Sequence, residues 1–175
     1  MLQKLSLIIP FFNEADSLPE LYDRVRQSAD ACVAAGQIAD WELWLIDDGS
    51  TDSSRLIAQR FVDADHRVGL IVFRKNRGKA AALQAGFTHA SGDVVITMDA
   101  DLQDDPCEIP RFLEKLEEGY DVVSGWKQKR NDPAEKRIPS RLFNTVTAKG
   151  SGVKIHDFNC GFKGYRSEVV RSIML

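Results

Sequence analysis

Residues 92–106 read GDVVITMDADLQDDP, an apolar run followed by four aspartates. The segment VVIT has the length and β-branched composition of a buried strand. Asp99 and Asp101 are separated by one residue, so in an extended chain their side chains point the same way. Like charges gathered at the end of a buried strand repel one another, and a nearby cation would relieve that repulsion. The stretch therefore predicts a buried strand that delivers a pair of carboxylates to a cation.

The same alternation of strand-like and helix-like patterns fills the first two-thirds of the chain. Apolar runs that read as further strands lie at residues 5–10, 41–47, 68–73 and 120–126. Helical patterns lie at residues 17–36, after the turn DDGST, at residues 79–90 and at about 106–118. Strands that are buried on both faces and joined by helices are typical of a parallel sheet. The predicted fold class is α/β, with a mostly parallel central sheet and helices on both faces.

Composition excludes several classes of function. A chain of 175 residues is one domain-sized unit, and its formal net charge of −3 argues against broad nucleic-acid binding. The three cysteines lie far apart without metal-ligand spacing, which suits a reducing cytoplasm. The first residues do not form a secretory signal, and no stretch approaches the length of a membrane span. Any membrane contact is therefore expected to be peripheral, or to involve chain beyond residue 175.

The character of the sequence changes after Trp126. The segment KQKRNDPAEKRIPSR is basic and polar and contains two prolines, which predicts a mobile loop. The remainder reads as a helix, an irregular segment and a final short helix. The chain ends inside this last helical pattern without a stop signal, so we expect it to be truncated at its C-terminal end.

Polar and charged clusters follow each of the first four predicted strands. They are PFFNE at residues 10–14, DDGS at 47–50, RKNRGK at 74–79 and DAD at 99–101. Any one of them reads as an ordinary turn. Because ligands of open α/β sheets bind outside the carboxyl ends of the strands, the four clusters together predict a binding site on one rim.

The aspartates of the opening stretch divide into two groups. Asp99 and Asp101, with Gln103 one step further, supply the oxygen ligands that Mg²⁺ or Mn²⁺ prefers. Asp104 and Asp105 are expected to cap the helix that begins near Pro106. The loop before residue 79 is neither a Walker A loop nor GxGxxG, although Lys79 or the N–H groups at the helix start could bind phosphate.

Six segments, taken in order, resemble glycosyltransferase family 2, and within it the branch of dolichyl-phosphate mannose synthases and bacterial polyprenyl-phosphate glycosyltransferases. They are IIPFFNE, LIDDGSTDSS, NRGKAAALQAG, GDVVITMDADLQDDP, DVVSGWKQKR and DFNCGFKGYR. The resemblance covers nearly the whole chain. It implies one GT-A type nucleotide-diphospho-sugar transferase domain over residues 1–175, with a nucleotide-sugar-binding part at 1–126 and an acceptor-side part at 127–175.

The resemblance also implies how the nucleotide is held. Pro10, Phe12 and Glu14 would cradle the base and ribose, and the family usually has tyrosine where this chain has Phe12. Ile46 and Asp48 would line the same pocket, with Asp48 reading the edge of the base. Lys79 is also expected to be one of the residues that bind the nucleotide sugar.

The resemblance also implies which residues bind the metal and take part in catalysis. Asp99, Asp101 and Gln103 match the family's metal site, and Ala100 would contact the sugar nucleotide through its backbone. Lys127 stands where the family has an arginine and would keep a positive charge near the diphosphate or the acceptor phosphate. The implied catalytic residues are Asp99, Asp101 and Lys127.

The implied function is metal-dependent, inverting transfer of a sugar from a UDP- or GDP-sugar to a polyprenyl or dolichyl phosphate, in cell-envelope or glycan biosynthesis. Such a protein would work at the cytoplasmic face of a membrane. Basic side chains after Trp126 would attract the lipid phosphate and the anionic membrane surface, or would form only a solvated loop; they are Lys127, Lys129, Arg130, Arg137 and Arg141.

Two other classes of function remain open. A nucleotidyltransferase also uses an α/β sheet with paired carboxylates, but it would usually have a basic, glycine-rich loop where this chain has FFNE. A truncated, non-catalytic fragment that binds nucleotide sugars is the second alternative.

Overall fold

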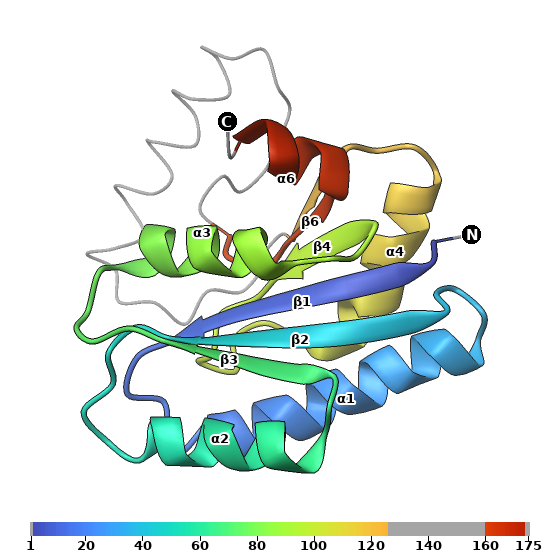
Figure 1. The fold of residues 1–175 in the computed structure, drawn as a ribbon. Helices are drawn as coiled ribbons and strands as arrows, with labels where there is room; N and C mark the ends of the chain where they lie inside the picture. The colour runs from blue at the N-terminus through green and yellow to red at the C-terminus, as the bar shows by residue number, and fades with distance from the viewer. Residues whose placement is uncertain (1, 126–159, 174–175) are drawn as a thin grey trace, which may run out of the picture.

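One central sheet organises the protein, with its strands in the order β3-β2-β1-β4-β6-β5 (Figure 1). The computed structural model describes residues 2–125 and 160–173. The strands are β1 (Lys4–Phe11), β2 (Asp40–Asp47), β3 (Val68–Val72), β4 (Val94–Thr97), β5 (Val122–Ser124) and β6 (Lys163–Arg166). The first four strands pair in parallel, whereas β6 runs antiparallel to both of its neighbours, β4 and β5. The predicted α/β class with a mostly parallel sheet is confirmed.

Helices cover both faces of this sheet, as predicted (Figure 1). On one face lie α1 (Leu18–Ala34), α2 (Ser54–Ala64) and α4 (Ile109–Glu117), and on the other lie α3 (Lys79–His89) and α6 (Ser167–Ile173). The position of β1 in the sheet explains why its sequence is almost continuously apolar. Leu7 and Ile9 belong to the larger buried cluster under α1, while Ile8 between them belongs to the cluster under α3. Both faces of the strand are therefore core.

The C-terminal part of the described chain differs from the prediction in one element. Residues 163–166 form the strand β6 between β4 and β5, and the sequence did not predict it. The segment is four residues long and pairs with strands distant in sequence, so its local pattern carries little information. The final short helix is confirmed as α6. The predicted basic loop and the helix after it lie outside the described residues.

The predicted helix at about 106–118 is divided in two. Residues Pro106–Glu108 form the short 3-10 helix η1, and α4 follows from Ile109. Asp105 is the N-cap of η1, and its carboxylate accepts a hydrogen bond of 3.0 Å from the Cys107 N–H. In residues 2–125 and 160–173, no helix combines the length and apolar character that crossing a bilayer requires.

Glu42 joins the amino-terminal ends of the strands, at the edge of the sheet opposite the polar clusters. Its carboxylate accepts hydrogen bonds from the Ser6 hydroxyl at 2.6 Å and the Ser91 N–H at 2.7 Å, and it pairs with the Lys4 ammonium at 2.8 Å. Burial by itself raises the pKa of this carboxyl, but the hydrogen bonds outweigh burial and lower the pKa from 4.5 to about 2. Glu42 therefore stabilises the folded protein mainly as a carboxylate.

Replacing Glu42 with glutamine should make the fold less sensitive to acid. Because its folded pKa lies below the unfolded value, Glu42 contributes stability above about pH 4.5, and this contribution is lost as the pH falls toward 2. We expect the loss of unfolding free energy over this window to shrink by about 3 kcal/mol in Glu42→Gln. Urea unfolding at a series of pH values measures it, with the exposed Glu118→Gln as the control. Identical pH profiles for Glu42→Gln and the wild type would contradict the assignment.

Candidate functional site

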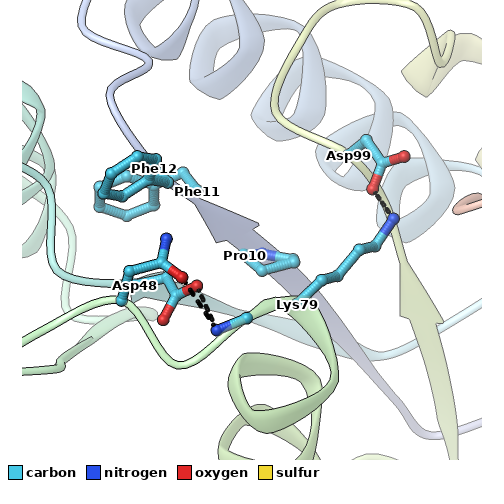
Figure 2. A pocket seen from close by; sticks show the side chains of 8 residues that line it. Pro10, Phe11, Phe12, Asp48, Lys79 and Asp99 are labelled. Carbon is cyan, nitrogen blue, oxygen red and sulfur yellow. Dashed lines mark hydrogen bonds and ion pairs between the residues drawn. The ribbon is translucent and has the colours of Figure 1, made fainter.

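A cavity of about 250 Å³ opens beyond the carboxyl ends of β1, β2 and β4 (Figure 2). Its walls come from the ends of three strands and from the loop between β3 and α3. The lining residues are Pro10, Phe11, Phe12, Asp48, Asn76, Gly78, Lys79 and Asp99. Each of the four clusters predicted to share one rim contributes to this wall. The pairing of Phe11 with Asp47 brings the ends of β1 and β2 level with one another.

Asp48 ties the end of β2 to the loop before α3. The residue is 5% exposed, and its two carboxylate oxygens accept hydrogen bonds from the N–H groups of Arg77, at 2.7 Å, and Gly78, at 2.9 Å. The carboxylate thus fixes the first residue of α3, Lys79, at the cavity. The neighbouring Asp47 lies deeper, fully buried, and pairs with Arg55 at 2.8 Å.

The segment after β1 is fastened to the turn after β2. Asn13 has a φ of +55°, a left-handed conformation that asparagine tolerates better than most residues. Its side-chain oxygen accepts a hydrogen bond from the Thr51 N–H at 2.8 Å, and its own N–H donates to the Ser50 hydroxyl at 3.0 Å. Phe12, just before it, is held at the cavity with 42% of its surface exposed.

Glu14, two residues after Phe12, is not among the residues that line the cavity. Its carboxylate accepts a hydrogen bond of 2.7 Å from the Ser17 hydroxyl, and its N–H donates to the Ser54 hydroxyl at 2.8 Å. These contacts join the start of α1 to the start of α2. The structure therefore shows Glu14 in a local hydrogen-bonding role next to the predicted base pocket.

Asp99 and Lys79 meet at the cavity from opposite sides (Figure 2). The ammonium of Lys79 forms an ion pair with the carboxylate of Asp99, whose side chain is 25% exposed. The N–H of Asp99 donates to the carboxylate of Asp104 at 3.1 Å. Asp104 is 3% exposed and braces this loop, while the N-cap of the following helix is Asp105, so the predicted capping role of Asp104 is wrong.

The backbone around Asp101 is not extended as the sequence argument assumed. Strand β4 ends at Thr97, the chain bends at residues 100–102, and Leu102 has a φ of +61°. Asp101 and Gln103 are exposed, and the Gln103 N–H donates to the Asp101 carboxylate at 3.1 Å. Of the three predicted metal ligands, Asp99 lines the cavity, whereas Asp101 and Gln103 are exposed and are not among the lining residues. No group of three or more His, Cys, Asp or Glu side chains suited to a metal occurs among residues 2–125 and 160–173.

Two other predicted site residues lie in the core. Ile46 is fully buried in the cluster under α3, and Ala100 is 5% exposed in the cluster on the opposite face. Neither is part of the cavity wall. Lys127 and the other basic residues after Trp126 lie outside the described residues.

Two residues that the sequence did not single out adjoin the site. Gly161 lies directly against the Asp99 carboxylate, and the Thr97 hydroxyl donates a hydrogen bond of 2.8 Å to the Gly161 carbonyl. The segment CGFK that contains Gly161 supported the family resemblance, but nothing in its composition indicated this contact. Only the pairing of β6 with β4 brings the two segments together.

Comparison with known proteins gives the family. The sequence profile of glycosyl transferase family 2 matches residues 6–174. The undecaprenyl-phosphate 4-deoxy-4-formamido-L-arabinose transferases of Salmonella paratyphi B and Salmonella typhimurium are each 40% identical over 174 residues, which is 99% of this chain and 52% of theirs. The chain thus spans about half the length of the curated relatives it matches.

Solved structures agree in fold. A mannosyltransferase from Pyrobaculum calidifontis, in complex with GDP-mannose and Mn²⁺, superposes with a TM-score of 0.70 at 22% identity, covering 97% of this chain and 46% of that one. Glucosyl-3-phosphoglycerate synthase from Mycobacterium tuberculosis, with Mn²⁺, UDP and phosphoglyceric acid, gives 0.71 at 19% identity, covering 95% and 57%. These neighbours have the GT-A fold. On the family profile and the 40% identity to the Salmonella enzymes, the chain belongs to glycosyl transferase family 2.

Proposed function

We propose that this chain is the nucleotide-sugar-binding part of a glycosyltransferase that moves a sugar onto a polyprenyl phosphate. The observation that carries the proposal is the cavity of Figure 2, where an aromatic ring, a carboxylate bound to a loop and a Lys79–Asp99 ion pair converge. The names of the Salmonella relatives, which are undecaprenyl-phosphate transferases, support a lipid phosphate as the acceptor.

The nucleotide would lie along the wall formed by Phe12, Asp48 and Lys79. A half-exposed aromatic ring offers a face on which a base can stack. The hydrogen bonds of Asp48 hold the loop before α3. The ammonium of Lys79 and the first N–H groups of that helix would then bind the diphosphate. Pro10 and Phe11 complete the apolar floor.

Asp99, Asp101 and Gln103 would hold a divalent cation, Mg²⁺ or Mn²⁺. Their oxygens are the donors that these hard cations prefer, and Asp99 already faces a cationic group, the Lys79 ammonium, at the cavity. When bound, the ion would supply positive charge to the leaving nucleoside diphosphate. Both structural neighbours described above contain Mn²⁺ with a nucleotide or nucleotide sugar.

With a polyprenyl phosphate as the acceptor, the reaction would not require a general base to remove a proton from the attacking oxygen. A polyprenyl phosphate is already an anion at neutral pH, so its oxygen can attack the sugar carbon without losing a proton first. In-line attack opposite the leaving diphosphate would invert the configuration at that carbon. Lys127 and the basic residues after it would attract the lipid phosphate at the cytoplasmic face of a membrane.

The proposal is tested in two steps on the 175-residue chain. Calorimetric titration with UDP and GDP, each with and without Mn²⁺, should show binding that requires the metal. A panel of nucleotide sugars with undecaprenyl phosphate should then yield a glycosylated lipid. Failure of every nucleotide to bind would overturn the proposal, whereas binding without turnover would support the non-catalytic fragment.

Truncating Phe12 should weaken nucleotide binding selectively. Stacking of a base on an aromatic ring contributes about 1–3 kcal/mol, so Phe12→Ala should lower affinity about 5- to 150-fold. Val72→Ala is the matched control, because Val72 is also 42% exposed but lies away from the cavity wall. Phe12→Tyr keeps the ring and adds a hydroxyl, and we expect it to strengthen one nucleotide over the other. Equal changes for UDP and GDP would show that this position does not select the base.

A further inference from the structure

Gly161 lies so close to Asp99 that no side chain fits between them. A Cβ built on Gly161 would be 2.3 Å from one carboxylate oxygen of Asp99 and 2.6 Å from the other. Its φ lies outside the left-handed range, so any L-residue could adopt this backbone conformation. Glycine is therefore required here for space next to the carboxylate and not for its conformational freedom.

The backbone of Gly161 cannot easily move away from Asp99. Thr97 is a buried residue, and its hydroxyl donates to the Gly161 carbonyl at 2.8 Å. The next residue, Phe162, is buried and stacks on Phe112 with ring centroids 4.3 Å apart. The Phe162 carbonyl also accepts a hydrogen bond of 2.9 Å from the N–H of Gly125. The segment is thus fixed to β4, to α4 and to the end of β5.

The Asp99 carboxylate is the part of this contact that can yield. It is the end of a side chain that is 25% exposed at the cavity, and it also forms an ion pair with Lys79. The backbone of Asp99 is held by Asp104, whose carboxylate accepts the Asp99 N–H at 3.1 Å. A methyl group on residue 161 would therefore turn the carboxylate and leave the surrounding backbone in place.

We propose that Gly161 is a positioning residue that acts through Asp99. By presenting no side chain, it lets the Asp99 carboxylate stand at the cavity wall where it can bind a cation. The inference rests on the proposed function, because it assumes that Asp99 binds the divalent ion used with the nucleotide sugar. The segment CGFK, which follows residues 126–159 in the sequence, would thus contribute to the site by leaving space for the Asp99 carboxylate.

The first test is Gly161→Ala, with Gly164→Ala as the control on β6. Displacement of a metal ligand by a neighbour should weaken Mn²⁺-dependent UDP or GDP binding roughly 10- to 100-fold, with a small shift in the urea midpoint. A Cβ on Gly164 would instead be 3.0 Å from Phe112 and 3.1 Å from Leu116, in the core. Gly164→Ala should therefore lower the urea midpoint more and leave affinity unchanged. Unchanged affinity in Gly161→Ala would overturn the inference.

The second test is a double-mutant cycle that does not depend on nucleotide binding. The change in urea midpoint caused by Gly161→Ala is measured in the wild type and in Asp99→Ala, which lacks the obstructing carboxylate. Coupled neighbours are non-additive, so the change should disappear in the Asp99→Ala background. If Gly161→Ala alone does not fold, the double variant should recover folding. An equal effect in both backgrounds, or a double variant that also fails to fold, would overturn the inference. Failure of the wild type to bind any nucleotide would instead overturn the proposed function.

Discussion

Replacing Asp101 with alanine is expected to abolish the Mn²⁺-dependent binding of UDP or GDP. Asp101 is exposed and lies two residues after Asp99, which lines the cavity. We propose that the negative charges of these two side chains hold the cation. Loss of a direct ligand should exceed the roughly 10- to 100-fold effect of losing a supporting residue. Isothermal titration of each nucleotide, with Mn²⁺ at a fixed saturating concentration, measures the effect.

Two further variants distinguish the loss of a metal ligand from a disruption of the local structure. In the wild type, the Gln103 N–H donates to the Asp101 carboxylate at 3.1 Å. Asp101→Asn keeps an oxygen that can accept this hydrogen bond but removes the negative charge. This variant should remain folded and lose nucleotide binding. Asp105→Ala removes a carboxylate four residues away that caps η1 and pairs with Arg24. It should reduce stability by about 1 kcal/mol and leave nucleotide affinity unchanged. If Asp101→Asn binds as the wild type does, Asp101 is not a metal ligand.

Replacing Gly49 with alanine is expected to cause the largest loss of stability among the variants considered. Gly49 has a φ of +81°, and its Cβ would lie 2.5–2.8 Å from backbone atoms of Lys75 and Asn76. A positive φ in a residue with a Cβ costs about 1–3 kcal/mol, and displacing packed backbone costs a further 1–3 kcal/mol or so. The free energy of unfolding should therefore fall by about 2–6 kcal/mol.

The same substitution should also damage the cavity. The loop it would displace includes Arg77 and Gly78, whose N–H groups bind Asp48, and it leads into Lys79. Nucleotide affinity should fall together with stability, as calorimetry and urea unfolding can show on the same sample.

Gly36→Ala provides the matched control for Gly49→Ala. Gly36 has a similar φ of +72°, but a Cβ there would meet nothing within 4 Å. It should cost only the part due to the backbone conformation, about 1–3 kcal/mol, and leave nucleotide binding intact. For each variant, a lower urea midpoint with an unchanged dependence of the unfolding free energy on urea concentration would show that the substitution reduced stability. Equal losses in the two variants would show that the close approach to the loop after β3 contributes nothing.

The sequence determined the parts of this protein that depend on local pattern. The run around Ile8 is apolar because both faces of β1 are buried, and the periodic positions of α1 follow its packing against one of those faces. Polar residues after each strand could be assigned to one rim because parallel strands end at the same edge of a sheet. Asp99 and Asp48 were predicted at the site for this reason, and both line the cavity.

What only the tertiary structure decided involves contacts between residues far apart in the chain. Asp48 binds N–H groups 29 and 30 residues away, and Asp99 meets Lys79 across the cavity. Ile46 lies in the core, although Asp48, two residues later, lines the cavity. Gly161 comes to lie against Asp99 only because β6 inserts between β4 and β5. Residue type and spacing report local preference, whereas such contacts depend on how separate segments pack together, and a four-residue strand has too little local pattern to reveal its partners.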